Sequence, residues 1–259
     1  KTDRANAFGT NRYIDTRGVC AEPVPFTRAV INGLAQGGGL YVPEELPKLP
    51  LEDILDLAKL PYRERAAAIY RAFNIDLGDE QISSLMRAAY GDNFDDERIC
   101  PITSLDENTH ILELWHGPTS AFKDMALQCL PRFFSASAAK LRDEGAIDHD
   151  FCILVATSGD TGKAALEGFK NVDGVSIGVL FPDGGVSDIQ RVFSDDRFAQ
   201  QLLDERKVAL SSANSINWGR LLPQVVYYVS SYAELVAAGK VEAGSPIDIC
   251  VPTGNFGNI

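Results

Sequence analysis

Apolar residues recur every three to four positions in three segments of the first hundred residues, which is the spacing of helices that bury one face. Pro, Gly or Asp residues separate these segments, as they commonly do at helix ends. Residues 33–47 are rich in Gly and Pro and predict a loop. Residues 1–108 are therefore predicted to form a mainly helical N-terminal domain. The expected helices are residues 51–60, 62–73 and 79–90.

From residue 109 onward, short and almost continuously apolar runs alternate with helical segments. Such runs, rich in β-branched residues, are typical of strands buried on both faces. Their alternation with helices predicts an α/β domain over residues 109–259, with mostly parallel sheets and helices on both faces. In such sheets, ligands bind at the carboxyl ends of the strands. The expected strands are residues 109–115, 151–158, 174–181 and 247–254, and the expected helices are 125–144, 162–169 and 217–239.

Composition narrows the class of protein. The chain has 259 residues, of which 45% are hydrophobic and 23% charged, and this is ordinary globular usage. The net charge of −12 disfavours binding to nucleic acid or to an anionic membrane surface. The first residues lack the apolar core of a signal peptide, and no run of about eighteen apolar residues occurs. We therefore expect a soluble, cytoplasmic protein.

Cysteine and histidine usage gives no sign of a metal site. The five cysteines contain no CxxC pair, and the three histidines do not have the spacing of metal ligands. Free thiols in a reducing cytoplasm fit this pattern best. No metal is predicted.

Four loops follow strand-like or short extended segments, and each offers residues that suit ligand binding. The first, residues 115–124, contains Lys123 at the start of a helix, where a lysine is commonly only solvated. In the second, residues 156–164, backbone N–H groups and hydroxyls can converge on an anion at a helix N-terminus. The same residues also serve as ordinary helix caps, so this motif is ambiguous.

The third and fourth loops also have two interpretations. Residues 212–220 combine Asn and Ser donors with Arg220, a residue type that binds phosphate or carboxylate through two parallel hydrogen bonds. The alternative is a capped helix with a surface arginine. Residues 252–259 contain GNFGN, whose small residues let the main chain approach a phosphate closely, although a Gly-Asn pair is often only a turn.

Two common nucleotide motifs fail. The sequence TSGDTGKA lacks the first glycine of a phosphate-binding P-loop, because Thr157 stands there, and Ala164 replaces the Ser or Thr that should follow Lys163. GNFGN is not the GxGxxG fingerprint of dinucleotide-binding domains. One lysine and three anion-binding loops instead suggest a phosphorylated cofactor beside an anionic substrate.

Six motifs, taken together and in order, closely resemble threonine synthases, which are pyridoxal-phosphate enzymes of the tryptophan-synthase-β-like fold type II. The resemblance runs from Tyr13 to Ile259. The motifs are YIDTRG, GLAQGGGLYVPEEL, FKDMALQ, TSGDTGKAALEG, SANSINWGR and PTGNFGNI.

The resemblance implies a role for each motif. Lys123 corresponds to the lysine that binds pyridoxal 5'-phosphate covalently and later moves protons as acid and base. The residues implied to hold the cofactor phosphate are Gly254, Asn255, Phe256, Gly257 and Asn258. Those implied to bind the substrate α-carboxylate are Thr157, Ser158, Gly159, Asp160 and Thr161. Those implied to bind the substrate γ-phosphate are Asn214, Ser215 and Arg220.

The implied reaction converts O-phospho-L-homoserine and water into L-threonine and phosphate, which makes the protein a carbon–oxygen lyase of threonine biosynthesis. It needs only small-molecule partners, in a monomer or a homodimer. The alternatives are another enzyme of the same fold type, such as a threonine or serine dehydratase or an O-acetylserine sulfhydrylase, and a catalytically silent relative or fragment that binds phosphorylated ligands. Because the family continues well beyond the position of Ile259, the C-terminal part of the fold is expected to be absent.

Overall fold

A computed structural model of the protein describes residues 9–156, 160–180, 196–211, 213 and 215–252. The helices predicted near the N-terminus are confirmed as α2 (Leu51–Asp56), α3 (Tyr62–Ala72) and α4 (Asp79–Ala89). A 3₁₀ turn, η2 (Leu57–Lys59), completes the first of these segments. Helix α4 has acidic residues in its first turn and Arg87 in its last turn, an arrangement that complements the helix dipole.

A small antiparallel sheet, which the sequence did not predict, lies in the same region. Its strand order is β2-β1-β3, and the strands are β1 (Arg12–Asp15), β2 (Val24–Pro25) and β3 (Tyr41–Pro43). Helix α1 (Phe26–Asn32) follows β2 directly, and the 3₁₀ turn η1 (Gln36–Gly38) precedes β3. The predicted loop at residues 33–47 therefore contains a turn of helix and a strand. Strands of two to four residues are too short to show a period.

The expected parallel sheet is present in the second half of the chain. Its order is β7-β6-β8, and both pairings are parallel. The strands are β6 (Asp150–Ala156), β7 (Val175–Leu180) and β8 (Val208–Ser211). Helix α7 (Asp160–Phe169) packs against β6 and β7, and α9 (Asp196–Arg206) lies beside β8. Strands β6 and β7 confirm two predicted strands, whereas β8 was not predicted.

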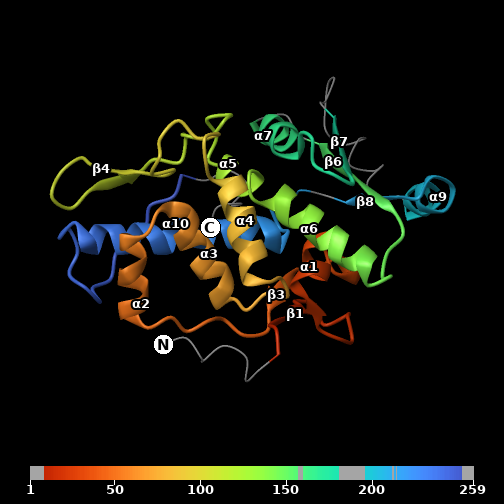
Figure 1. The fold of residues 1–259 in the computed structure, drawn as a ribbon, viewed down its shortest axis with the longest axis horizontal. Helices are drawn as coiled ribbons and strands as arrows, with labels where there is room; N and C mark the ends of the chain where they lie inside the picture. The colour runs from red at the N-terminus through yellow and green to blue at the C-terminus, as the bar shows by residue number, and fades with distance from the viewer. Residues whose placement is uncertain (1–8, 157–159, 181–195, 212, 214, 253–259) are drawn as a thin grey trace.

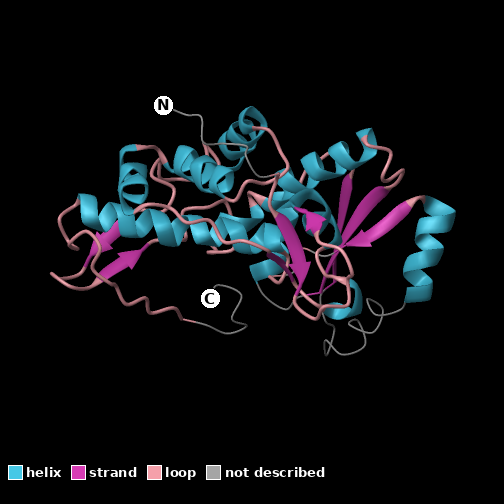
Figure 2. Ribbon diagram, turned by 90° about the horizontal axis from the view of Figure 1, so that it is seen from below, coloured by secondary structure: helices cyan, strands magenta, loops and turns pink. Residues whose placement is uncertain are grey.

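Two of the strands predicted for the parallel sheet are not found in that sheet among the described residues. Residues 109–115 contain only the short strand β5 (His110–Leu112), which pairs antiparallel with β4 (Ile102–Ser104) instead of joining the parallel sheet. The β4–β5 hairpin and the parallel sheet lie at opposite ends of the molecule (Figures 1 and 2). Of residues 247–254, the described part, 247–252, contains no strand, and Ile249 is 54% exposed. Apolar content alone did not distinguish these segments from buried strands.

The helical segment predicted at 125–144 is divided into two helices. These are α5 (Asp124–Leu127) and α6 (Leu130–Asp143), and Pro131 lies in the first turn of α6. A proline fits that position because its missing N–H group would have no helical partner there. The break leaves α5 as a separate short helix, and its first turn follows Lys123.

Helix α10 (Trp218–Ala237) runs through the middle of the molecule and contacts α2, α3, α5 and α6 (Figure 1). Arg65 of α3 is nearly buried, donates a 2.7 Å hydrogen bond to Ser230 and forms an ion pair with Glu234, both on α10. Aromatic rings from distant segments meet in the same core: Phe26 packs edge-on against Phe133 with ring centroids 6.1 Å apart. Helix α10 therefore packs against helices from both halves of the chain. Division of the chain at residue 108 into two domains stays a prediction.

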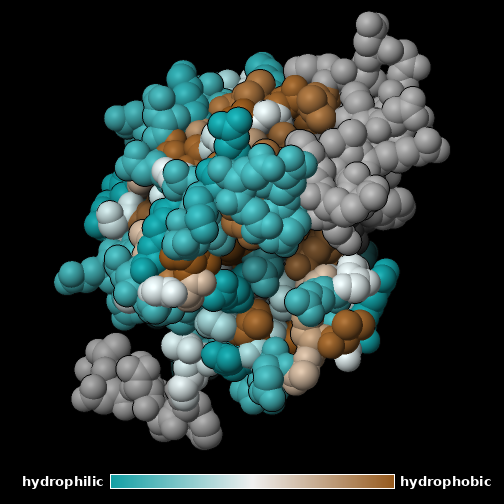
Figure 3. All heavy atoms as spheres, turned by 90° about the vertical axis from the view of Figure 1, so that its right-hand side faces the viewer, coloured by the Kyte–Doolittle hydropathy of each residue, from teal (hydrophilic) through white to brown (hydrophobic). Residues whose placement is uncertain are grey.

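None of the helices in the described residues has the length and apolar character needed to cross a bilayer. On the side of the molecule where α9 projects, hydrophilic residues cover most of the surface and hydrophobic residues form separate patches (Figure 3).

Candidate active site

The loop before α5 is held in shape by its own side chains. The buried Asp124 carboxylate accepts hydrogen bonds from the Thr119 backbone N–H at 2.8 Å and from the Thr119 hydroxyl at 2.7 Å. A Cβ atom at Gly117 would lie 2.4 Å from the Asp124 Cβ, so only glycine fits. Ser120 has a φ of 56°, a left-handed conformation that is strained for a residue with a side chain. These contacts fix where the chain enters α5, immediately after Lys123.

The segment that follows α4 holds the other end of this segment. The Tyr90 hydroxyl donates a 2.7 Å hydrogen bond to the Met125 carbonyl oxygen, and the Asn93 amide donates a 3.0 Å bond to the side-chain oxygen of Gln128. Because α5 has only four residues, its own hydrogen bonds could not keep it in place. Its orientation depends on these external contacts.

A close approach of two helices places α7 beside α5. At Gly168, near the end of α7, a Cβ atom would lie 2.0 Å from the Leu127 carbonyl oxygen. Only a glycine permits this distance. At the other end of α7, the Asp160 carboxylate accepts a 2.7 Å hydrogen bond from the Lys123 ammonium, and the two groups form an ion pair. The Lys123 side chain is 18% exposed, so its amine remains accessible.

Helix α10 contributes Arg220 from its first turn. Asn217 caps this helix by accepting a 2.8 Å hydrogen bond from the Gly219 N–H, and its amide donates a 2.9 Å bond to the Val30 carbonyl oxygen. The Arg220 side chain folds back and donates a 2.9 Å bond to the Ala213 carbonyl oxygen. The alternative interpretation of a surface arginine is wrong, because Arg220 is only 2% exposed.

Arg220 is a buried cation whose hydrogen bonds are incomplete among the residues that the structure describes. Its Nε atom is buried and has no hydrogen-bond partner in the described part of the chain. Burial lowers the pKa of Arg220 to about 10, while the negative charge of Asp160 acts in the opposite direction. The guanidinium is therefore still charged at neutral pH. A buried charge with an unused donor is costly, and an anion bound there would offset that cost.

Five of the predicted site residues fall within the described structure. Lys123 and Asp160 are in direct contact, and Arg220 lies close enough for the Asp160 charge to affect it. Thr161 and Ser215 are half-buried, in the first turn of α7 and just before α10. Their roles as ligand-binding residues stay predictions. The remaining predicted residues lie outside the described residues: Thr157, Ser158, Gly159, Asn214, Gly254, Asn255, Phe256, Gly257 and Asn258.

Sequence reasoning missed the residues that position the lysine. Thr119 and Asp124 form a polar pair five positions apart, a spacing too general to identify on its own. Gly168 gave a better signal, since a glycine inside a helical pattern weakens the helix and commonly has a packing reason. Gly168 therefore predicts that another segment lies close to α7, but it does not show that this segment is α5.

Comparison with known proteins supports this picture. Residues 12–90 match the family model described as the threonine synthase N terminus. Human threonine synthase-like 1 is 40% identical over 95% of this chain, which covers 38% of that protein. The threonine synthase of Pseudomonas aeruginosa is 39% identical over 96% of this chain, which covers 55% of it. The chain thus spans about half the length, or less, of these relatives.

Solved structures agree with the sequence relatives. The crystal structure of threonine synthase from Brucella melitensis with bound PLP superposes with a TM-score of 0.78 at 35% identity, over 96% of this chain and 56% of that one. Threonine synthase from yeast superposes with a TM-score of 0.80 at 30% identity, over 95% of this chain and 54% of that one. The fold is therefore that of the pyridoxal-phosphate enzymes of fold type II. Within that class, the resemblance to threonine synthases is confirmed over most of the chain.

Proposed function

We propose that this protein acts as a threonine synthase, converting O-phospho-L-homoserine and water into L-threonine and phosphate. The main supporting observation is the 2.7 Å contact between Lys123 and Asp160, which joins two of the threonine-synthase motifs beside the buried Arg220. Because the relatives are about twice as long as this chain, the proposal concerns the activity of a complete protein. A cytoplasmic location and a monomeric or homodimeric state are part of the same proposal.

The described residues fit pyridoxal phosphate as cofactor. Lys123 presents an accessible amine, with a carboxylate to balance its charge, at the entrance to α5. Its Nζ atom would bind the cofactor covalently, and residues 254–258 would hold the cofactor phosphate. When bound, the cofactor supplies an electron sink that stabilises negative charge on the carbon next to the amine. The remaining steps fall to side chains of the protein.

Lys123 is the proposed acid and base. Its amine would take the proton from the substrate Cα and return a proton later, and each transfer requires Nζ to stay within hydrogen-bond reach of the reacting carbon. Asp160 restricts where Nζ lies and balances the charge when the amine is protonated. A substrate α-carboxylate would bind at the N-terminus of α7, where backbone N–H groups lack helical partners.

Arg220 is the proposed binding residue for the substrate γ-phosphate. The unused Nε–H donor of a charged guanidinium suits a phosphate oxygen. A guanidinium buried before the substrate arrives needs no rearrangement to stabilise the charge that develops on the departing phosphate.

The covalent role of Lys123 can be tested by borohydride reduction in the presence of pyridoxal phosphate, followed by peptide mapping. We expect the label on the peptide that contains Lys123, and its loss in Lys123→Ala. Lys163, an exposed lysine on α7, provides the matched control, because Lys163→Ala should leave the labelling unchanged. A label found on other lysines would contradict the proposal.

The substrate can be tested by measuring phosphate release from O-phosphohomoserine, with deamination of L-serine as the comparison. We expect Arg220→Lys to lower kcat/KM for O-phosphohomoserine by about 100-fold or more, since one well-placed donor to developing charge is worth about that factor. Unchanged cofactor absorbance and circular dichroism would show that the variant is folded. Faster turnover of L-serine would assign the protein to the dehydratases instead.

A further inference from the structure

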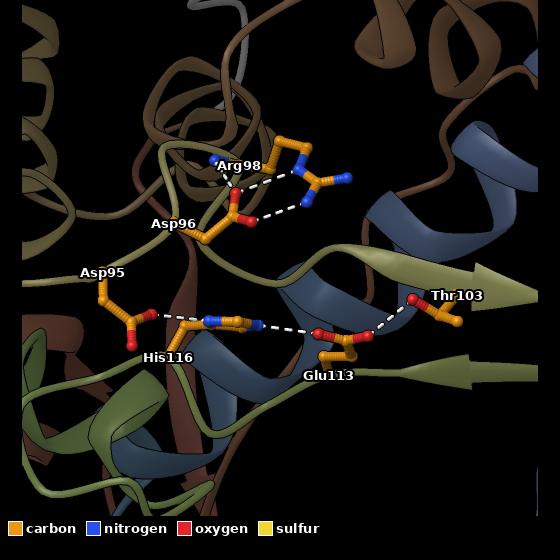
Figure 4. Close-up of polar contacts among 6 residues, drawn as sticks. All are labelled: Asp95, Asp96, Arg98, Thr103, Glu113 and His116. Carbon is orange, nitrogen blue, oxygen red and sulfur yellow. Dashed lines mark hydrogen bonds and ion pairs between the residues drawn. The ribbon is translucent and has the colours of Figure 1, made fainter.

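His116 lies between two carboxylates, directly before the loop that leads to Lys123. Its Nδ1 atom is 2.5 Å from Asp95 Oδ1, and its Nε2 atom is 2.8 Å from Glu113 Oε2 (Figure 4). The other Glu113 oxygen accepts a 2.5 Å hydrogen bond from the Thr103 hydroxyl. A neutral imidazole can donate from only one nitrogen, whereas both contacts here require a donor. The arrangement therefore fits a doubly protonated ring.

Main-chain contacts join the same residues. The Asp95 N–H donates a 3.0 Å hydrogen bond to the His116 carbonyl oxygen, and the Glu113 N–H donates a 2.9 Å bond to the Pro101 carbonyl oxygen. His116 is thus linked to the segment after α4 through its backbone and through its ring. Gly117 is the next residue in the chain, so these contacts hold the start of the loop at residues 117–123. The hydrogen bonds between Thr119 and Asp124 hold its end.

The charges that face His116 favour its protonated form. The hydrogen bond that the His116 ring donates to Glu113 raises the pKa of His116 above its ordinary value; partial burial opposes this rise, and Asp95 and Asp96 add to it. Asp96 itself binds Arg98 through both carboxylate oxygens, which balances much of its charge (Figure 4). The His116 and Glu113 side chains are 15% and 18% exposed, whereas the Asp95 side chain is 77% exposed, so only the Glu113 side of the bridge is shielded from solvent.

We propose that His116 is a positioning residue: its imidazolium bridges Asp95 and Glu113 and so fixes the loop that delivers Lys123 to Asp160. Loss of one ring proton removes a donor from one side of the bridge, and the start of the loop loosens. The consequence for catalysis rests on the proposed function of Lys123. The bridge between His116 and its two carboxylates does not depend on that function. The bridge and the function of Lys123 can therefore be tested separately.

The protonation state can be followed by NMR, because the chain has only three histidines and each ring signal can be assigned by a His→Gln substitution. We expect the His116 signal to titrate above the ordinary histidine value of about 6.5. In Glu113→Gln and in Asp95→Asn its midpoint should fall, because each variant removes a carboxylate from one ring nitrogen. A midpoint that neither variant changes would overturn the bridge.

Loop order can be measured by amide hydrogen exchange in residues 117–123. The Thr119 and Ser120 N–H groups are useful reporters, since both are hydrogen-bonded within the loop. At a pH where His116 is charged, His116→Gln should exchange about fivefold faster than the wild type at these amides, as expected for the loss of one charge-assisted hydrogen bond in a partly exposed site. Exchange in α9, far from the loop, should not change.

The pH dependence of amide exchange shows whether His116 holds the loop through its charge or only through packing of its ring. The ratio of exchange rates between variant and wild type should approach one above the titration midpoint of His116, where the wild type has also lost its bridge. A ratio that is one at every pH, or that stays constant at a higher value, would overturn the proposal. The matched control is His110→Gln in the β4–β5 hairpin, whose ring contacts Ser104, and it should leave the loop amides unchanged. Cofactor is absent from both measurements, so they can succeed even if Lys123 proves not to bind it.

Discussion

Replacing Gly168 by alanine would place a methyl group in the space where α7 lies against α5. The added Cβ would be 2.0 Å from the Leu127 carbonyl oxygen, and contacts of a Cβ below 3.0 Å essentially do not occur in proteins. The blocking atom belongs to the backbone, so no side chain can rotate away. Helix α7 would have to move by about 1 Å, and the 2.7 Å contact between Lys123 and Asp160 would lengthen with it.

The expected magnitude follows from two opposing effects. Overpacking of a buried contact costs about 1–3 kcal/mol, and a backbone obstacle places Gly168→Ala at the upper end of this range. Alanine is the better helix former by about 1 kcal/mol, which offsets part of the cost. The free energy of unfolding should therefore fall by about 2 kcal/mol. At a helical glycine without a close neighbour, the same substitution would stabilise the protein.

Urea unfolding followed by tryptophan fluorescence provides the assay, because Trp218 is buried and should report the transition. The control is Gly78→Ala at the N-terminal cap of α4, where no atom lies within 4 Å of the added Cβ and φ is −70°. Alanine is a poorer N-cap than glycine, but without a backbone obstacle the loss of stability in Gly78→Ala should stay below about 1 kcal/mol. If Gly168→Ala were as stable as the wild type, or more stable, the close approach of α7 and α5 would be refuted.

Three further predictions concern stability. Asn217→Ala removes the cap of α10 and should cost about 1–2 kcal/mol in urea unfolding. Burial alone would raise the pKa of Asp76, but the hydrogen bond from Lys140 helps to lower it, so Asp76 stabilises the fold above about pH 4 and less as the pH falls through its lowered pKa. The melting temperature of Asp76→Asn should therefore be lower than that of the wild type at pH 7, and the difference should shrink in acid. Arg65→Met should cost about 2–3 kcal/mol by leaving Glu234 without its partner, and the double variant Arg65→Met/Glu234→Met should recover most of this loss in the same urea assay.

The sequence predicted long, regular elements better than short ones. Helices α3 and α4 have eleven residues each, so the three-to-four spacing repeats often enough to be seen. Strand β8 has four residues and was missed, although it completes the parallel sheet. Strand β5 is apolar like a central strand, yet it lies in a hairpin, because pairing partners depend on tertiary contacts that a local pattern does not contain.

The site shows the same limit. Lys123 could be identified as a candidate only through motifs in other loops, since a lysine at a helix start is commonplace. Its contact with Asp160 joins residues 37 positions apart in the chain and depends on how α7 packs. The Arg220 guanidinium likewise contacts the Ala213 carbonyl oxygen, a hydrogen bond that the local sequence pattern does not reveal. The residue types in the sequence indicated which groups belong to the candidate site. The distances between these groups and their burial could be known only from the folded structure.

The buried Arg220 also links folding to the chemical composition of the surrounding solution. The Arg220 Nε–H has no partner in the described ranges of the chain, which lowers the stability of the ligand-free protein, and an anion that binds there only in the folded state would restore it by mass action. At a ligand concentration one hundred times the Kd, this effect amounts to about 2.7 kcal/mol. If the proposed phosphorylated substrate binds at Arg220, the folded protein is most stable where that substrate is abundant, so its supply would influence how long the chain stays folded.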